Sequence, residues 1–367
     1  MWAEIDLGAV EANVRTLLGM CAPGTKLIAV VKANAYGHGA AEIAHAALRA
    51  GAWGLAVARV EEGVELRRAG VAAPVLVMGY APDEALPAAL EHNLTLTMSD
   101  LHTSALLSTF AAAAGRTADV HLEVDTGMHR YGVDIADAPG VVEALSDLPG
   151  VRLAGMYTHY ASADATDTRV FDRQLEAFTN LVSELQQRGL RPEIVHASNS
   201  PALHSLDSCF DAVRPGIALY GVRPSSHWSP SLRPVMAVKA HVGRVFDVRA
   251  GEAVSYGGRY VATHAHRAAV IACGYADGYM RSLSGRGEVL LHGRRCRVLG
   301  TVCMDSFVVG LPDGLEAAPG DEAVVLGAQG EERVSAEELA ERAGTIAYEL
   351  LCGMCRRGSR IYLRPAG

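Results

Sequence analysis

The sequence predicts a (β/α)₈ barrel of the TIM type, followed by a mainly β domain. The chain has 367 residues, which exceeds what a single hydrophobic core usually serves. From Thr25 to about Tyr220, short β-branched runs alternate with amphipathic stretches, a pattern typical of βα units and a parallel sheet. After Arg233 the sequence changes to strand-like runs separated by turn residues. These three observations indicate two domains.

Eight runs in the first part of the chain are candidate barrel strands. They cover residues 27–31, 53–58, 75–79, 95–98, 120–124, 153–158, 193–196 and 213–220. The clearest helix between them covers residues 171–188, where apolar side chains fall on one stripe. Because periodicity cannot show whether a sheet closes, an open doubly wound sheet remains the alternative to the barrel.

The second part of the chain predicts strands with one helix near the end. The strand candidates cover residues 236–248, 268–273, 287–291, 297–302 and 322–326, and the helix covers 336–343 and extends toward Cys352. Residues 224–234 are rich in proline and serine, which favours a domain boundary there. We therefore expect a barrel over residues 1–230 and a β-rich domain over residues 231–367.

Composition excludes several classes of function. The net charge is −8 without a basic stripe, so we expect no nucleic-acid partner. No run approaches the roughly 20 apolar residues of a membrane span, and acids occupy the place of a signal peptide's basic patch, so a cytoplasmic protein is expected. The spacing of Cys352 and Cys355 would suit a redox or zinc pair, but no second pair accompanies it, so we predict no metal.

Polar side chains follow several of the predicted barrel strands, where active sites of such barrels lie. They include Lys32, Arg130, His159 and Ser200, while Arg214 lies within the eighth predicted strand. A lysine in this place is often a solvated charge, and a lone histidine is often part of the core. Their convergence on one rim is what predicts a site. Ser200 and the backbone amides of Gly216 and Ile217 could bind a phosphate group there without a basic cluster.

The motifs in this order resemble alanine racemase, a fold-type III enzyme that uses pyridoxal 5′-phosphate (PLP). The stretch Ala29-Val-Val-Lys32-Ala-Asn-Ala-Tyr36-Gly-His-Gly39 resembles the signature around the Schiff-base lysine. Further motifs of the family stand at residues 124–130, 157–159, 196–200, 213–221, 254–257, 274–278, 302–305 and 346–349. The resemblance therefore covers nearly the whole chain.

The resemblance implies a function for each matching residue. Lys32 would bind PLP covalently, and the phosphate would be held by Tyr36, Ser200, Gly216, Ile217 and Tyr348. A head-to-tail homodimer is implied, in which Tyr256, Met304 and Asp305 complete the partner's site and Tyr275 narrows its entrance. The substrate would be alanine, and D-alanine for cell-wall peptidoglycan would be the product.

Racemisation needs a base on each side of the α-carbon, because a proton leaves one face and another arrives on the opposite face. The resemblance implies that Lys32 serves the D face and Tyr256 of the partner the L face. His159 would connect this tyrosine with Arg214, which faces the pyridine nitrogen of PLP. Arg130 would contact the phenolic oxygen of PLP and the substrate carboxylate, a planar group that guanidinium recognises well.

One residue departs from the family pattern. Many relatives have a carbamylated lysine two positions before the Asp-Thr-Gly run, where this sequence has Glu123. Since a glutamate already carries the negative charge, we expect Glu123 to pair with Arg130 directly, or through a water or an ion. His129, which precedes Arg130, is bulkier than usual and is interpreted as a loop side chain.

Other functions remain open at this point. A serine racemase or a racemase of broad specificity would use the same catalytic pair. A fold-type III decarboxylase would not need a tyrosine base. A non-catalytic PLP-binding protein could share the barrel, but its relatives lack a second domain.

Overall fold

The computed structural model describes residues 1–226 and 228–364. Its contacts divide the chain into two compact units. The barrel unit comprises Val10–Ala35 and the described residues between Ala40 and Leu232, and the β unit comprises Met1–Ala9, Tyr36–Gly39 and the described residues from Arg233 onward. The predicted boundary assigned residues 1–9 to the barrel, whereas their strand β1 (Trp2–Asp6) pairs with strands of the β unit.

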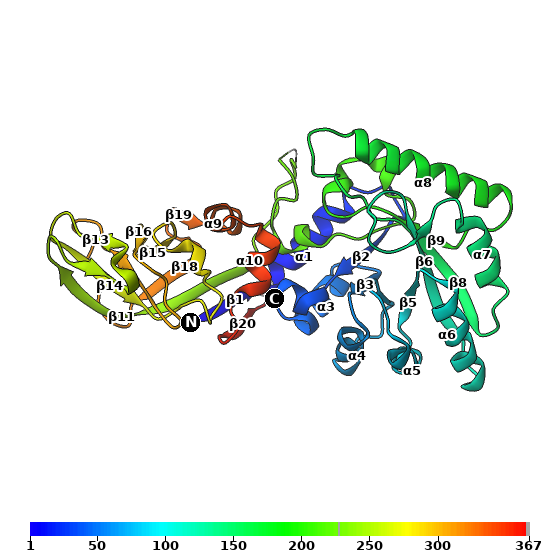
Figure 1. Ribbon diagram of the computed structural model, residues 1–367, viewed down its shortest axis with the longest axis horizontal. Coiled ribbons are helices and arrows are strands. Elements are labelled where there is room, and N and C mark those ends of the chain that lie inside the picture. The colour runs from blue at the N-terminus through cyan, green and yellow to red at the C-terminus, as the bar shows by residue number, and fades with distance from the viewer. Residues whose placement is uncertain (227, 365–367) are drawn as a thin grey trace. The chain divides into compact units, whose positions relative to one another are not determined.

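Eight parallel strands form the closed barrel (Figure 1). Their bounds are β2 Lys26–Val30, β3 Gly54–Val57, β4 Val75–Val77, β5 Thr95–Met98, β6 Ala118–Asp125, β8 Val151–Tyr157, β9 Ile194–His196 and β10 Ala212–Val213. β5 pairs with β6 and β10 pairs with β2, which closes the ring. The barrel is therefore confirmed and the open sheet is excluded. The two-residue strand β7 (Val133–Asp134) pairs in parallel with the last two residues of β6 and is not part of the ring.

Helices follow the strands and lie outside the barrel (Figure 1). They are α3 Ala40–Arg49, α4 Val60–Arg68, α5 Leu86–Glu91, α6 Leu101–Ala113, α7 Ala138–Ser146 and α8 Arg169–Gln187, while α1 (Leu7–Leu18) precedes β2. The predicted helix at 171–188 corresponds to α8, whose buried stripe is apolar except for Gln174. No helix in the described part of the chain is both long and apolar enough to cross a membrane.

The last barrel strand is shorter than predicted. The sequence predicted a strand over residues 213–220, but β10 ends at Val213 and Ile217–Tyr220 forms a short 3₁₀ helix, η4. Pro215 has no N–H to continue a ladder, which ends the strand there. Gly221 closes the 3₁₀ helix in a left-handed conformation with φ 80°.

The β unit is a second closed sheet. A ring of antiparallel strands is formed by β11 Met236–Val248, β14 His266–Ile271, β15 Glu288–Leu291, β16 Arg294–Leu299, β17 Phe307–Gly310 and β18 Glu322–Gln329. β1 joins β11 antiparallel, and β20 (Ser359–Leu363) joins β1 in parallel. The short strands β12 (Ala253–Val254) and β13 (Tyr260–Val261) form a separate hairpin. The five predicted strands are present. The strands β1, β12, β13, β17, β19 (Glu332–Val334) and β20 were not predicted.

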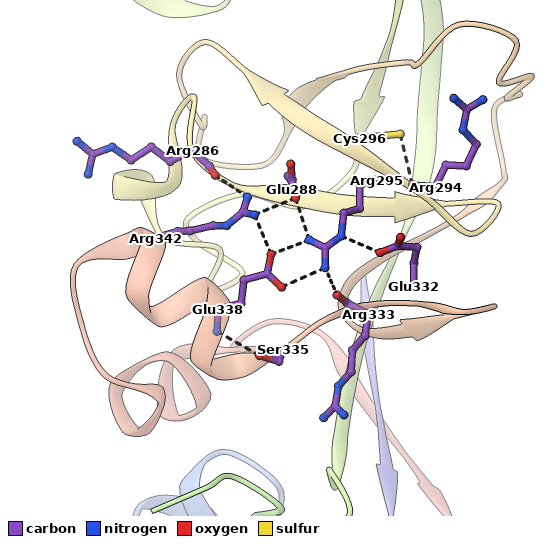
Figure 2. Close-up of polar contacts among 10 residues, drawn as sticks. All are labelled: Arg286, Glu288, Arg294, Arg295, Cys296, Glu332, Arg333, Ser335, Glu338 and Arg342. Carbon is purple, nitrogen blue, oxygen red and sulfur yellow. Dashed lines mark hydrogen bonds and ion pairs between the residues drawn. The ribbon is translucent and has the colours of Figure 1, made fainter. Parts of the chain in front are cut away.

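A network of ion pairs fixes helix α9 (Ala336–Ala343) to the strands β15, β16 and β19 (Glu332–Val334), as Figure 2 shows. Arg295 contacts Glu288 at 2.9 Å, Glu332 at 2.8 Å and Glu338 at 2.6 Å. Arg342 contacts Glu288 and Glu338 at 3.0 and 2.8 Å. Each half-exposed pair contributes up to about 1 kcal/mol. Two cations shared among three carboxylates hold this helix more firmly than one pair would.

A glycine ends α9 earlier than the sequence predicted. The predicted helix continued toward Cys352, but Gly344 adopts φ 77° and separates α9 from α10 (Ala347–Gly353). A left-handed glycine is a common way to end a helix.

Candidate active site

A cavity of about 390 Å³ opens at the C-terminal ends of the barrel strands. Three of the predicted site residues line it: Lys32 after β2, Arg130 after β6 and His159 after β8. The complete lining is Lys32, Ala58, Arg59, Met78, Gly79, Tyr80, Glu123, Arg130, Tyr131, Tyr157 and His159. Three cationic side chains and one carboxylate thus share this cavity, which suits an anionic ligand.

Lys32 begins one turn of left-handed helix. Ala33, Asn34 and Ala35 have φ of 53–54°, and Tyr36 has φ 52°. L-residues in this conformation cost roughly 1–2 kcal/mol each. The turn is held by a hydrogen bond from the Ala35 amide to the Val31 carbonyl at 2.8 Å and by one from the Ala40 amide to the Asn34 side chain at 2.8 Å. Such strain, maintained by surrounding bonds, is typical of functional sites.

Arg214 is buried, with 2% of its surface exposed. Its Nη2 donates to the backbone carbonyls of Thr158 and Ala197 at 2.8 and 3.1 Å and lies 3.4 Å from His159 Nδ1. Its Nη1 donates to His196 Nδ1 at 2.6 Å. The guanidinium is therefore oriented by four acceptors and keeps its charge in the barrel interior.

Two buried histidines continue this hydrogen-bond chain. Because His196 Nδ1 accepts from Arg214, its proton is on Nε2, which donates to His121 Nδ1 at 2.8 Å. Burial and the charge of Arg214 lower the pKa of His121 to about 3 and the pKa of His196 well below its ordinary value. Burial and the charges of Arg214, Arg130 and Lys32 lower the pKa of His159 to about 3. All three imidazoles are neutral at physiological pH.

Glu123 hydrogen-bonds Tyr157 and makes no ion pair with Arg130 among the residues that the structure describes. Its Oε2 accepts from the Tyr157 hydroxyl at 3.1 Å, and Tyr157 lies 2.9 Å from the Thr97 hydroxyl. The Arg214 guanidinium lies over the Tyr157 ring at 4.8 Å. The hypothesis of a direct Glu123–Arg130 pair is therefore wrong for this structure. The short glutamate side chain, fixed by Tyr157 inside the barrel, acts on the arginine only through charge.

The loop that carries Arg130 is organised by Asp125. Its Oδ1 accepts from the amides of Gly127, Met128 and His129 at 2.8, 3.0 and 3.1 Å, and its Oδ2 lies 2.9 Å from His129 Nδ1. Although burial alone would raise the pKa of Asp125, the hydrogen bonds from Gly127 and His129 hold it below its ordinary value. His129, interpreted as a loop side chain, helps to close this turn with φ 52°.

The predicted phosphate site lies between β9 and β10. Ser200 is 3% exposed, and its Oγ accepts from the amides of Gly216 at 2.8 Å and Ala218 at 3.3 Å. The hydroxyl proton of Ser200 is then available to donate. Ile217, whose amide was predicted to bind phosphate, begins η4 directly after Gly216.

Two further predicted cofactor residues meet in the β unit. The rings of Tyr36 and Tyr348 lie 6.0 Å apart. Gly37 follows with φ 84°, and a Cβ there would approach the Leu351 carbonyl oxygen to 2.5 Å, so the position requires glycine. Burial raises the pKa of Tyr36, which keeps its phenol protonated and able to donate a hydrogen bond.

The residues predicted to act on a partner subunit are exposed in their own chain. Tyr256 is 75% exposed and follows Ser255, which is fixed by a 2.6 Å hydrogen bond to the Thr301 carbonyl. Met304 is 51% and Tyr275 38% exposed, and the Tyr275 amide donates to the Cys303 carbonyl at 3.0 Å.

Asp305 belongs to the same loop as Met304 and accepts from Arg357 at 2.8 Å. Arg357 also donates to Asp277 at 3.0 Å, so it connects two of the motifs.

Several residues of the site were not predicted. His121, His196, Tyr157, Gln174 and Glu62 were absent from the candidates. Gln174 Nε2 donates to the His159 carbonyl at 3.0 Å and to Thr126 Oγ1 at 3.1 Å, which joins the loops after β8 and β6. The signal was present in β6, where His121, Glu123 and Asp125 alternate with apolar residues. In a strand, such alternation places polar side chains on one face.

Family comparisons agree with this geometry. A model of the alanine racemase N-terminal domain matches residues 5–224, and one of the C-terminal domain matches residues 235–362. A curated alanine racemase of Symbiobacterium thermophilum is 44% identical, over 98% of this chain and 96% of its own length. The chain belongs to the alanine racemase family.

Solved structures of alanine racemases have the same fold. That of the D-cycloserine producer Streptomyces lavendulae is 41% identical with a TM-score of 0.94, covering 100% of this chain and 97% of its own. That of Bacillus anthracis, solved with bound L-Ala-P, is 36% identical with a TM-score of 0.93, covering 100% and 95%. The match to the family therefore includes both the barrel and the β unit.

The buried position of Glu123 predicts how the free energy of unfolding of this protein depends on pH. Burial raises the pKa of Glu123, although the Tyr157 hydrogen bond and the charges of Arg214 and Arg130 oppose this effect. An acid whose pKa is raised on folding stabilises the protein at low pH, and this contribution is lost as the pH rises through the folded-state pKa. Glu123→Gln cannot ionise. Its free energy of unfolding relative to wild type should rise as the pH increases from about 4.3, the ordinary pKa of glutamate, through the raised folded-state pKa of Glu123.

Urea unfolding at several pH values measures this difference. Glu65→Gln, at an exposed position on α4, is the matched control and should show no such slope. A Glu123→Gln variant that loses stability relative to wild type as the pH rises would contradict the prediction.

Proposed function

We propose that the protein interconverts L-alanine and D-alanine with PLP as its cofactor. The observation that carries this proposal is the Lys32 amine in a cavity with Arg130 and His159, in a chain that matches alanine racemases over both units. A lysine at this place can hold an aldehyde cofactor covalently.

The residues present fit PLP. The Ser200 hydroxyl, whose oxygen accepts from the amides of Gly216 and Ala218, would donate its proton to a phosphate group together with the Ile217 amide, and Arg130 offers a cation to an anionic oxygen. Arg214 would face the pyridine nitrogen, as the resemblance to the family implies, and its guanidinium would not give that nitrogen a proton. When bound, PLP supplies the electron sink that makes the α-hydrogen of an amino acid acidic. By withholding a proton from the ring, Arg214 would favour racemisation over transamination.

Two bases of the protein then move the proton. Lys32 serves the D face of the α-carbon, and Tyr256 of a partner subunit serves the L face. The high exposure of Tyr256 and Met304 in their own chain supports a head-to-tail homodimer with shared active sites. In this arrangement Met304, Asp305 and Tyr275 limit the space around the substrate, while Arg130 holds its carboxylate.

Neutral His159 connects Arg214 with the tyrosine base. Because its Nδ1 accepts from Arg214, its Nε2 carries the proton. This Nε2 lies 3.5 Å from Asn199 Nδ2 in its own chain, and in the proposed dimer the phenolate oxygen of Tyr256 would accept its proton. Hydrogen bonding to the phenolate stabilises it and helps Tyr256 to act as a base.

The test is to incubate the PLP-loaded protein with L-alanine and to follow D-alanine by chiral chromatography. Rapid formation of D-alanine is expected. The other proteinogenic amino acids, serine first, are assayed in parallel, and carbon dioxide release is measured. Preferred turnover of serine would indicate a serine racemase, and release of carbon dioxide would indicate a decarboxylase. A complete lack of turnover would indicate a non-catalytic PLP-binding protein. Each of these outcomes would contradict the proposal. Production of D-alanine for peptidoglycan precursors would place the protein in the cytoplasm.

A further inference from the structure

Glu62 on α4 connects the loops that follow two neighbouring barrel strands. Its Oε1 accepts from the Ala33 amide at 2.6 Å, and its Oε2 accepts from the amides of Ala58 and Arg59 at 2.8 and 3.1 Å. The last two bonds cap the first turn of its own helix. The first reaches 29 residues back along the chain, to the loop after β2.

Two of the three donors belong to the wall of the active-site cavity, and the third is next to a residue of that wall. Ala58 and Arg59 line the cavity, and Ala33 follows the lining residue Lys32. Ala33 is also the first residue of the left-handed turn, with φ 53°. At roughly 1–2 kcal/mol per residue, the turn would relax without bonds that hold it. The Glu62 carboxylate fixes the turn at its first residue, next to Lys32.

A carboxylate is required at this position because both oxygens must accept. Hydrogen bonds to an ionised acceptor are roughly twice as strong as neutral ones. A glutamine has one acceptor oxygen, and its amide group would direct N–H donors against the backbone N–H of either Ala33 or Ala58. It therefore cannot satisfy both loops at once.

We propose that Glu62 is a positioning residue for Lys32. The Glu62 carboxylate holds the left-handed turn, so that the Lys32 amine keeps its place in the cavity. The inference deepens the proposed function and rests on it for the effect on catalysis. Its geometric part, the placing of Lys32, can be tested separately. Misplacing a reacting group by about 1 Å can reduce the rate as much as 10²-fold.

The first readout is catalysis by Glu62→Gln, with Glu61→Gln as the matched control at the neighbouring exposed position of α4. Glu62→Gln should lower kcat by about tenfold or more while KM for alanine changes little, because only the reacting amine is displaced. Glu61→Gln should leave both constants unchanged. A rise in KM alone would indicate that Glu62 shapes the substrate pocket instead, and would overturn the proposal.

A second readout needs no activity. The chain contains only three lysines, Lys26, Lys32 and Lys239, so peptide mass spectrometry can follow the labelling of each by an amine-reactive ester. In the absence of PLP, Glu62→Gln should change the labelling rate of Lys32 severalfold and leave those of Lys26 and Lys239 unchanged. Unchanged Lys32 labelling would overturn the proposal even in an active enzyme. Changed labelling in a protein without racemase activity would support it while the proposed function failed.

Relief of the backbone strain provides a third readout. Glycine adopts the left-handed conformation without the steric cost of alanine. If Glu62 acts by holding the strained turn, Ala33→Gly should restore part of kcat, about threefold, in the Glu62→Gln background. A double variant whose kcat stays at or below that of Glu62→Gln would contradict this mechanism.

Discussion

Lys32→Ala is expected to lower the rate of alanine racemisation by about 10³- to 10⁴-fold. Alanine offers neither an amine to hold the cofactor nor a base for the D face. Lys32 lies in the cavity with Arg130 and His159, and neither of the other two lysines can replace its amine. Lys26 is in β2 with its ammonium over the Trp53 ring. Lys239 is paired with Glu4 and Glu322 in the β unit. The loss should appear in kcat and in covalent binding of PLP together.

Lys26→Ala is the matched control. It removes the other lysine of the barrel unit, which lies in β2 outside the cavity, and should keep kcat within about threefold of wild type. Chiral chromatography gives the rates, and peptide mass spectrometry after borohydride reduction identifies the lysine that carries PLP. Racemisation by Lys32→Ala within tenfold of wild type would show that another group is the base.

The barrel could be predicted because several of its strands are buried on both faces and are continuous apolar runs in the sequence. β3 and β4, for example, are buried throughout. The end of β10 was harder to predict from the sequence, because Pro215 ends the hydrogen-bond ladder while the apolar residues continue beyond it. β1 and β20 are short, alternating strands whose partners lie far away along the chain, so local periodicity carries little information about them.

The site could be predicted where it depends on position along a strand, and not where it depends on side-chain direction. Lys32, Arg130 and His159 follow strand ends, and the closed barrel brings them together. The partner of Glu123 depends instead on the pairing of β6 with β8, which places Tyr157 beside Glu123, so the expected contact with Arg130 was wrong. A contact between neighbouring strands has no signature in the spacing of residues.

Glu62 illustrates the same limit from another direction. It stands in a Glu-Glu-Gly run at a helix start, which resembles an ordinary solvated helix terminus. Only the fold shows that one of its oxygens reaches the Ala33 amide. The role of Tyr256 could not be inferred from the single chain, in which its side chain is exposed. The proposed function of this tyrosine rests on the resemblance to the family.

Tyr256→Phe is expected to lower racemisation by about 10²- to 10⁴-fold, with an asymmetry between the enantiomers. Tyr256 is the proposed base for the L face, whereas Lys32, the proposed base for the D face, remains intact. In D₂O, the variant should therefore lose exchange of the α-hydrogen of L-alanine and keep much of the exchange of D-alanine. Proton NMR of each enantiomer measures both rates. Tyr260→Phe, which removes a hydroxyl that contacts His266 at 3.2 Å, is the matched control.

Mixing two inactive variants distinguishes a shared site from a site within one chain. In a heterodimer of Lys32→Ala with Tyr256→Phe, shared sites give one site that lacks both bases and one that retains both. Co-expression or subunit exchange should therefore restore activity, up to half of the wild-type rate per heterodimer. If both bases of a site came from one chain, every site would lack a base and no activity would return.

Equal loss of exchange from both enantiomers in Tyr256→Phe would instead argue that the tyrosine positions the substrate and is not the base of one face.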